Sequence, residues 1–228
     1  MFTLSTPAAP ALHSGMTRPT PSSDSRPYHH GDLRSALIRS ALDLLRSEGL
    51  EALTLRGVAR AAGVSQAAPY RHFADRRALV AAVAEEGFRR LQEEMVAAYR
   101  ANPGPAGFKQ IALAYVRFAR ENPAEYRVMF GPEVAQQDDL PALRQTSHGV
   151  LDFTRQGIEG LQHAGMIGPG DPWRMAVACW AMLHGLAMLF LDGQTQGVES
   201  SPDELLETAT RMLMFGMAVR REGSGPIP

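Results

Sequence analysis

The chain contains a single cysteine, Cys179, in 228 residues. One thiol excludes an internal disulfide bond, and it can form a zinc or iron–sulfur site only if histidines and carboxylates supply the other ligands. The spacing of His148, His163 and His184 around this cysteine matches no familiar ligand pattern. We therefore expect neither a metal nor another cofactor.

Export signals and catalytic motifs are also missing. The first residues do not combine a basic stretch with an apolar run of signal-peptide length, so the sequence favours a cytoplasmic protein. It has no nucleophile elbow, phosphate-binding loop, dinucleotide-binding fingerprint or zincin motif, and we expect no enzymatic activity.

No stretch alternates apolar and polar residues as a half-buried strand does, and helical periodicity recurs between Gly and Pro breaks. The sequence therefore predicts an all-α fold. Residues 1–27, rich in Pro, Ser, Thr and Ala, and residues 222–228 are predicted to be disordered tails. The expected helices span residues 32–48, 55–62, 66–72, 76–101, 106–121, 124–130, 139–164, 172–191 and 203–221.

The charge is distributed unevenly, although the net charge is only −1. Residues 28–77 carry eight Arg against five Asp and Glu, a net charge of +3. Residues 78–228 carry 13 basic and 18 acidic side chains, a net charge of −5. A basic front joined to an acidic rear indicates that the front meets a polyanion such as DNA.

Residues 53–73, Leu-Thr-Leu-Arg-Gly-Val-Ala-Arg-Ala-Ala-Gly-Val-Ser-Gln-Ala-Ala-Pro-Tyr-Arg-His-Phe, have the pattern of a helix-turn-helix. Thr54 is placed to cap the first helix, whose apolar residues recur at helical spacing up to Ala62. Gly63 suits a left-handed turn position, and Ser65 can cap the second helix. On spacing alone, the same pattern also fits a helical hairpin within an ordinary bundle.

The second helix would present small and polar side chains to a major groove. Gln66 can pair with adenine, Arg71 can pair with guanine or phosphate, and alanine methyl groups can contact a thymine methyl. Pro69 in the first turn would forfeit roughly one backbone hydrogen bond and crowd the carbonyl four residues back. We therefore expect this helix to begin late or to be tilted.

Together with Tyr-His-His-Gly-Asp-Leu-Arg at residues 28–34, the stretch 53–79 resembles the N-terminal DNA-binding domain of TetR-type repressors. The resemblance implies that Tyr70 and Arg76 contact phosphates, that Arg56 and Gln66 read bases, and that Phe73 is structural. The family more often has an aliphatic residue at the position of Pro69. The complete set of expected DNA contacts is Thr54, Arg56, Ser65, Gln66, Ala67, Ala68, Tyr70, Arg71, His72 and Arg76.

Residues 175–191 are apolar on all sides except at His184. A membrane span is conceivable, but the run is short, and Asp192 follows it at once, which favours a helix buried on both faces. One face would pack in its own domain and the other against a second copy, as a palindromic operator requires. The expected dimer contacts are Leu183, Ala187, Leu205, Ala209, Met212, Leu213 and Gly216.

Residues 180–185, Trp-Ala-Met-Leu-His-Gly, resemble the tryptophan-histidine-glycine signature of a C-terminal effector domain of TetR-type proteins. The resemblance implies a ligand-responsive, dimerising domain at 105–221, joined by a connecting helix and linker at 81–104 to the helix-turn-helix domain at 28–80. The expected contacts with a partly apolar effector are Tyr115, Phe118, Phe130, Phe153, Trp180 and His184. A packed Trp with a hydrogen-bonded core His, among plain core aromatics, also fits this pattern.

These observations predict a cytoplasmic, ligand-responsive repressor that binds a palindromic operator as a homodimer, without a membrane. The alternative is a helical small-molecule-binding or enzymatic protein that keeps the front domain only as a scaffold.

Overall fold

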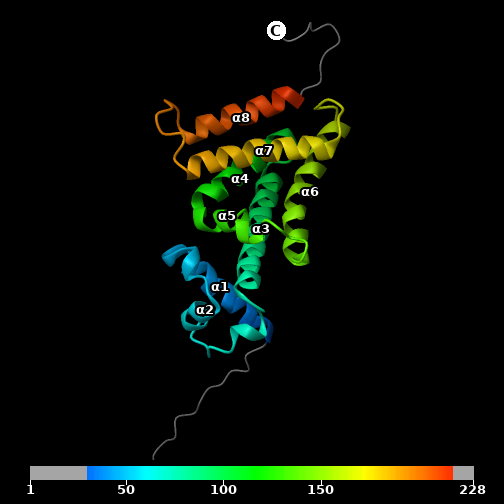
Figure 1. The fold of residues 1–228 in the computed structure, drawn as a ribbon. Helices are drawn as coiled ribbons and strands as arrows, with labels where there is room; N and C mark the ends of the chain where they lie inside the picture. Colours follow the sequence, from blue (N-terminus) through cyan, green and yellow to red (C-terminus); the bar gives the residue numbers. More distant parts are fainter. Residues whose placement is uncertain (1–29, 218–228) are drawn as a thin grey trace, which may run out of the picture.

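The computed structural model of the protein describes residues 30–217, without the side chains of residues 30–32, 105, 215 and 217. This part of the chain is helical throughout and contains no strand, which confirms the predicted all-α fold (Figure 1). The predicted tails lie outside the described residues. The α-helices are α1 (His30–Glu48), α2 (Leu55–Ala61), α3 (Arg76–Ala101), α4 (Pro105–Glu121), α5 (Pro123–Met129), α6 (Pro141–His163), α7 (Pro172–Leu191) and α8 (Pro202–Met217).

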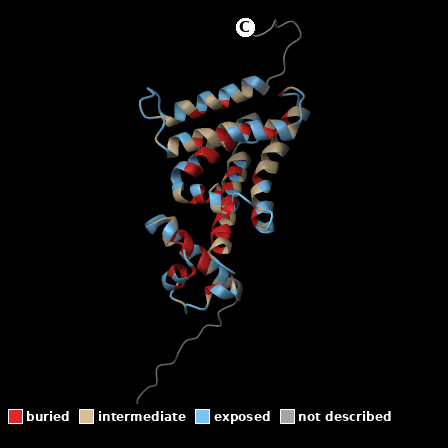
Figure 2. Ribbon diagram, viewed as in Figure 1, coloured by how far each residue is buried: buried red, intermediate tan, exposed pale blue. Residues whose placement is uncertain are grey.

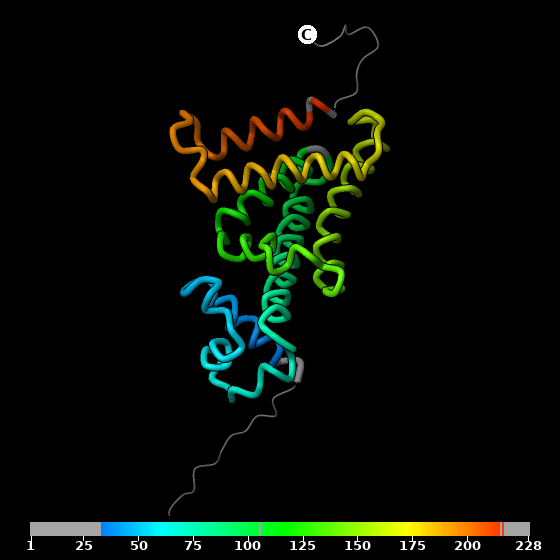
Figure 3. The backbone as a smooth tube through the Cα atoms, viewed as in Figure 1, coloured from blue at the N-terminus to red at the C-terminus, as the bar shows by residue number. Residues whose placement is uncertain are grey.

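The helices form a small head and a larger body (Figure 1). The head contains α1 and α2, with short 3-10 helices at Leu50–Ala52 and Pro69–Arg71. The long helix α3 leaves the head and runs into the body, where α4, α5 and α6 pack around it. Helices α7 and α8 lie side by side in opposite directions at the end of the body farthest from the head (Figure 3).

Each helix of the body begins at a proline: Pro105, Pro123, Pro141, Pro172 and Pro202. The first turn of a helix tolerates proline because its missing N–H would have no helical partner there, and the ring fixes φ near its helical value. These prolines therefore separate successive helices of the body without disturbing any of them.

One hydrophobic core extends from the head into the body along α3 (Figure 2). On this helix Leu79, Phe88 and Leu91 are buried, and the head and body share the same cluster of apolar side chains. At Gly87 the chain of α5 comes so close that an added Cβ would lie 2.7 Å from the Met129 Sδ atom. The missing side chain thus lets α5 pack directly on α3.

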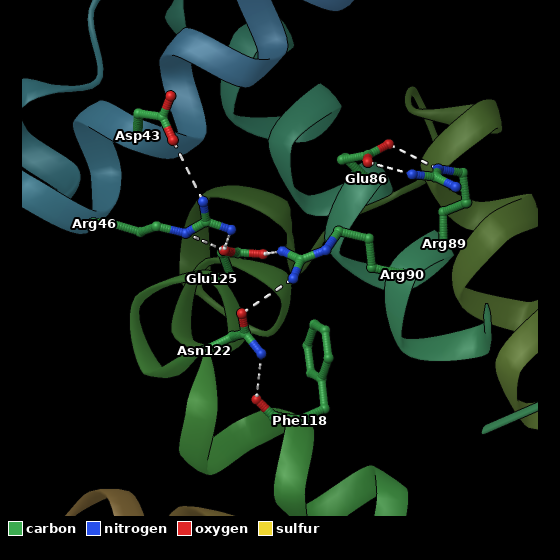
Figure 4. Close-up of polar contacts among 8 residues, drawn as sticks. All are labelled: Asp43, Arg46, Glu86, Arg89, Arg90, Phe118, Asn122 and Glu125. Atoms are coloured by element: carbon green, nitrogen blue, oxygen red, sulfur yellow. Dashed lines mark hydrogen bonds and ion pairs between the residues drawn. The ribbon is translucent and has the colours of Figure 1, made fainter. Parts of the chain in front are cut away.

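Glu125 of α5 is a charged side chain buried in the described core, where it is only 1% exposed. Figure 4 shows the guanidinium groups of two arginines pointing toward it. Arg46 of α1 donates from Nε to its Oε1 atom over 2.7 Å, and Arg90 of α3 pairs with its Oε2 atom. Arg90 also donates to the Asn122 Oδ1 atom over 3.2 Å. One carboxylate therefore ties together the head, the long helix and the short helix α5.

Replacing Glu125 with Gln should lower the free energy of unfolding by about 3 kcal/mol, because two guanidinium groups would lose their buried counter-charge. The measurement is urea unfolding followed by circular dichroism at one fixed protein concentration. Glu86→Gln is the matched control, since Glu86 and Arg89 form an ion pair on the open side of the same long helix. The control should change stability by less than about 1 kcal/mol. Equal effects of the two substitutions would contradict the role given to Glu125.

Candidate nucleic-acid interface and effector cavity

Helix α2 and the turn after it have the geometry that the sequence predicts. The Thr54 side chain accepts a hydrogen bond from the Gly57 N–H over 2.9 Å and so caps the helix. Gly63 has φ of +67°, a left-handed conformation that glycine adopts without strain. The Val64 N–H then bonds the Ala59 carbonyl over 3.0 Å, which completes a standard helix-ending motif. The turn is therefore fixed by local hydrogen bonds.

The prediction of an α-helix at residues 66–72 is wrong. The chain instead makes a turn, in which the Ala68 N–H bonds the Ser65 carbonyl over 3.0 Å, and then the 3-10 helix Pro69–Arg71. Proline has no N–H to continue an α-helical ladder to Ser65, and its ring crowds that carbonyl. Ser65 consequently caps no α-helix, and the region from Ser65 to His72, called the recognition segment below, is shorter than a full recognition helix.

The recognition segment and α2 nevertheless turn polar side chains outward. Gln66, Tyr70 and Arg71 are exposed on the segment, and Ala67 lies beside them. On α2, Arg56 is exposed, as is Thr54 just before the helix. On the recognition segment, Ala68 and His72 are half-buried. Phe73, which follows the segment, is buried in the core, as expected from the resemblance.

Arg60 was missing from the expected DNA contacts. It is exposed one helical turn after Arg56, and both side chains border the same shallow groove as Gln66. The spacing of four residues was a signal that would have found it, because residues four apart share one face of a helix. Guanidinium and amide groups gathered on one exposed face can bind phosphates and base edges.

Arg76 does not have the free guanidinium expected of a phosphate contact. Its Nε atom donates to the Leu53 carbonyl over 3.0 Å and its Nη2 atom to the Leu50 carbonyl over 3.1 Å. Its Nη1 atom lies 3.7 Å from a Glu133 carboxylate oxygen. In the single chain Arg76 therefore has a structural role, because its side chain closes the loop between α1 and α2 against α3.

The next residue, Arg77, joins the head to the segment between α5 and α6. It donates to the carbonyls of Glu133 and Gln136, over 3.2 and 2.7 Å, and forms a two-point ion pair with Asp139. The Arg77 hydrogen bonds lower the pKa of the Asp139 carboxyl below its usual value. The first turn of α3 is thus attached to residues 133–139, which sequence reasoning could not foresee because they are distant in the chain.

The body encloses a cavity of about 340 Å³ between α3, α4, α6, α7 and α8. Of the expected ligand contacts, Tyr115, Phe130 and Trp180 line it. Phe118 is buried under the Arg90 guanidinium, and Phe153 packs against Tyr99. Further lining residues that were not expected from the sequence include Phe88, Met95, Phe108, Cys179 and Met214.

His184 lies behind the cavity wall in a hydrogen-bonded cluster rather than on the lining. The Tyr126 hydroxyl bonds both the His184 Nδ1 atom, over 2.7 Å, and the Tyr115 hydroxyl, over 2.8 Å. Trp180 donates from Nε1 to the Tyr115 oxygen over 3.0 Å. Burial raises the pKa of Tyr115 to about 12, raises that of Tyr126 further, and lowers that of His184. All three groups are therefore held in their neutral forms.

Helices α7 and α8 carry large apolar side chains that are exposed in the single chain. Trp173 and Val177 are each 46% exposed, Leu189 is 47% exposed, and Met212 is 63% exposed. We call these four residues, with Trp180, the outer apolar face. Helix α7 is also long and apolar enough to cross a membrane by length and composition alone.

The seven expected dimer residues differ in how far they are exposed. Leu183 and Ala187 are buried in the core of their own chain, which corrects their assignment to an interface. Leu205, Ala209 and Leu213 are half-buried, and Leu213 lines the cavity. Only Met212 and Gly216 are exposed among the seven.

Two family models match the chain, one on each side of α3. Residues 37–83 match the bacterial regulatory proteins of the tetR family, and residues 108–213 match the tetracyclin repressor-like C-terminal domain. The chain belongs to the TetR family.

The chain is also similar to individual proteins, over different lengths of its sequence. Over 52 residues the chain is 52% identical to the class C tetracycline repressor protein of Escherichia coli, a match that covers 23% of this chain and 24% of the repressor. The structure of a protein with unknown function from Rhodococcus sp. RHA1 is similar over 86% of this chain and 100% of its own, with 36% identity and a TM-score of 0.76. A bacterial regulatory protein in the tetR family from Rhodococcus RHA1 shares the fold, with 19% identity, a TM-score of 0.63 and coverage of 83% and 98%.

The two matched regions of this TetR-family chain correspond to the two sites. The N-terminal match contains α2 and the recognition segment, whereas the C-terminal match contains Tyr115, Tyr126, Trp180 and most of the cavity lining. In the described part of the chain, no group of three or more His, Cys, Asp or Glu side chains is arranged to hold a metal ion.

His184 should make the stability of the protein depend on pH. Burial lowers its pKa in the folded state, so the unfolded chain binds a proton more readily, and the unfolded pKa lies near 6.5. The stability associated with neutral His184 is therefore present above about pH 6.5 and decreases as the pH falls below that value. His184→Asn should reduce the loss of melting temperature between pH 7.5 and 5.5.

The matched control for this pH experiment is His163→Asn, because His163 is exposed at the end of α6. This variant should keep the wild-type dependence on pH. Melting curves at several pH values measure both variants, and an unchanged pH profile for His184→Asn would refute the role of the cluster.

Proposed function

We propose that this TetR-family protein is a ligand-responsive transcriptional repressor, which binds a palindromic operator as a homodimer in the bacterial cytoplasm. The observation that carries the proposal is the capped α2 and recognition segment, which present Arg56, Gln66 and Arg71 at the end of the molecule opposite the cavity. The named function of the class C tetracycline repressor supports repression, and the match covers 24% of that protein. We propose regulation rather than catalysis, since both matched family models belong to regulators.

DNA binding would divide the exposed side chains into two classes. Tyr70, Arg71 and Thr54 would contact phosphates, which fix the orientation of the head on the duplex. Arg56 and Gln66 would reach base edges and so determine sequence preference. The proposed contact surface also includes the remaining expected contacts, because they lie on the recognition segment: Ser65, Ala67, Ala68 and His72.

Arg71→Ala should weaken binding roughly tenfold at all sequences and reduce the dependence of affinity on salt by about one phosphate contact. Gln66→Ala should instead change the preference at one base pair. Footprinting on DNA that flanks the protein's own gene would locate the operator, and fluorescence anisotropy at several salt concentrations would measure both variants.

Arg100→Ala is the control for these measurements. Arg100 is exposed at the far end of α3, in the body, so its loss should leave the affinity for DNA unchanged. A wild-type protein without salt-dependent affinity for any DNA near its gene would contradict the proposed function.

A second copy of the chain is the proposed occupant of the outer apolar face. Only 22% of the apolar window of α7 is buried in the single chain, and pairing α7 and α8 of two copies would cover the rest in a four-helix interface. Two heads held in this way could reach half-sites about 34 Å apart.

Val177→Glu combined with Met212→Glu should convert the protein to monomers, because both charges would be buried in the proposed interface. Sedimentation velocity measures the change, and operator affinity should fall with it. Met166→Glu is the control, since Met166 is 49% exposed but lies outside the outer apolar face. A wild-type protein that is monomeric in solution and partitions into lipid vesicles would point to a membrane as the occupant instead.

A ligand in the cavity would change the position of the head through the segment between α5 and α6. Val134 and Ala135 line the cavity, and the carbonyls of their neighbours Glu133 and Gln136 bind Arg77 at the start of α3. A ligand that pushes this segment outward would therefore move the first turn of α3 and the head attached to it. A small change in the spacing of the two heads is enough to disturb simultaneous contact with two half-sites.

A further inference from the structure

We propose that the cavity is selective for uncharged, mainly apolar molecules whose few polar atoms face α6. This inference rests on the proposed function, because it names the chemical class of the effector.

The cavity is built to exclude water from an apolar molecule. Its volume of about 340 Å³ lies near the lower end of the range for small-molecule sites, roughly 300–1,000 Å³. Aromatic side chains from α3, α4 and α7, and Phe130 just after α5, meet thioethers there, and methionine adapts its shape to an irregular ligand. The aromatic and methionine lining consists of Phe88, Met95, Phe108, Tyr115, Met129, Phe130, Trp180 and Met214.

No Asp, Glu, Lys or Arg side chain lines the cavity within the described residues. Nearby charges are already paired elsewhere: Arg90 with Glu125, and Arg155 with both Asp152 and Glu159. Three lining groups can ionise. His148 is exposed on α6, at the edge of the cavity, whereas the two buried groups are held neutral, because burial raises the pKa of Tyr115 to about 12 and that of Cys179 to about 11. A charged ligand would lose its hydration without gaining a counter-charge, so it should bind much more weakly than a neutral molecule of the same shape.

Polar lining side chains are concentrated at one wall. They lie on α6 or just before it, and each is at least partly accessible to solvent. We call these four residues, Gln137, Ser147, His148 and Thr154, the α6 wall. Deeper polar atoms already have partners within the protein, since Thr210 donates to the Leu206 carbonyl over 2.7 Å and the Tyr115 hydroxyl is bonded to Tyr126 and Trp180. At the α6 wall, Ser147 donates to the Gln137 Oε1 atom over 3.0 Å and Thr154 donates to the Val150 carbonyl over 3.4 Å. A hydroxyl oxygen that donates one hydrogen bond can still accept another, so these two groups can accept from the polar group of a ligand.

A matched set of compounds on one aromatic frame tests the selectivity. At pH 7.5, 2-naphthol is neutral, 2-naphthoate is an anion and 2-naphthylmethylammonium is a cation. Isothermal titration calorimetry on the full chain without DNA should give 2-naphthol a Kd at least tenfold lower than that of either ion. Binding of either ion as tightly as 2-naphthol, or no detectable binding of 2-naphthol, would overturn the inference.

A charge introduced on the α6 wall should reverse this order. Thr154→Lys places an ammonium group beside the cavity, and it should make 2-naphthoate bind more tightly than 2-naphthol. Gln156→Lys is the control, because Gln156 is exposed on the same helix and does not line the cavity; this variant should keep the wild-type order. An unchanged order in Thr154→Lys, in a protein with a wild-type melting temperature, would show that the charge of the lining does not set selectivity.

The calorimetry separates this inference from the proposed function. If 2-naphthol binds more tightly than its ions but leaves operator affinity unchanged, the ligand class is supported and ligand-responsive repression is contradicted. If the ions bind more tightly and release the operator, the proposed function is supported and the inferred ligand class is overturned.

Discussion

A buried carboxylate, Glu125, holds the head and the body of this protein in one arrangement. An unpaired charge in such a place would be strongly unfavourable, and it is tolerated because guanidinium groups from both α1 and α3 bind it (Figure 4). Ion pairs of this kind depend on position, since a guanidinium moved by a few ångströms no longer compensates for the lost hydration. The short helix α5 therefore cannot move relative to α1 and α3 without breaking the contacts that allow Glu125 to be buried.

The residues that follow Glu125 extend this constraint to the cavity. Tyr126 belongs to the cluster with Tyr115 and His184, and Met129 and Phe130 line the cavity itself. Beyond them, the segment 133–139 is bonded to Arg77 at the start of α3. A stretch of about fifteen residues is thus attached to the head at both ends and faces the cavity between them. Apolar packing alone could slide, whereas in the proposed repressor the directional ion pairs at both ends would transmit a displacement of this stretch to the head.

Local features of the fold could be predicted from the sequence, and features set by distant residues could not. Thr54 and Gly63 determine the beginning and end of the first helix of the helix-turn-helix through bonds to neighbours within five residues, so their pattern was sufficient. The effect of Pro69 was visible as a conflict, but its outcome as a 3-10 helix depends on how the buried proline packs in the head. The structural role of Arg76 could not be predicted because its carbonyl partners, Leu50 and Leu53, are more than twenty residues away.

The residues that line the cavity could also be predicted only in part. Tyr115, Phe130 and Trp180 were found as aromatics in the rear of the chain, yet Phe88 and Met95 were missed because they lie on α3, which the sequence presents as a connecting helix. Leu183 and Ala187 were assigned to the wrong face of α7 for a related reason. A helix that is apolar on all sides has no stripe from which to choose its inner face, so only tertiary packing decides which side is buried.

Packing gives α7 a buried inner face and an exposed outer face. Its inner face is formed by Ala176, Cys179, Leu183 and Ala187 at helical spacing, and all four are buried. Trp180 lies at the boundary: it lines the cavity, donates to the Tyr115 hydroxyl, and remains 38% exposed on the outer apolar face. In the proposed dimer, one rigid indole ring would therefore belong both to the cavity and to the subunit interface. A ligand that shifts this ring would alter the packing between the two copies as well as the segment attached to Arg77, so both routes to the heads start from the same cavity.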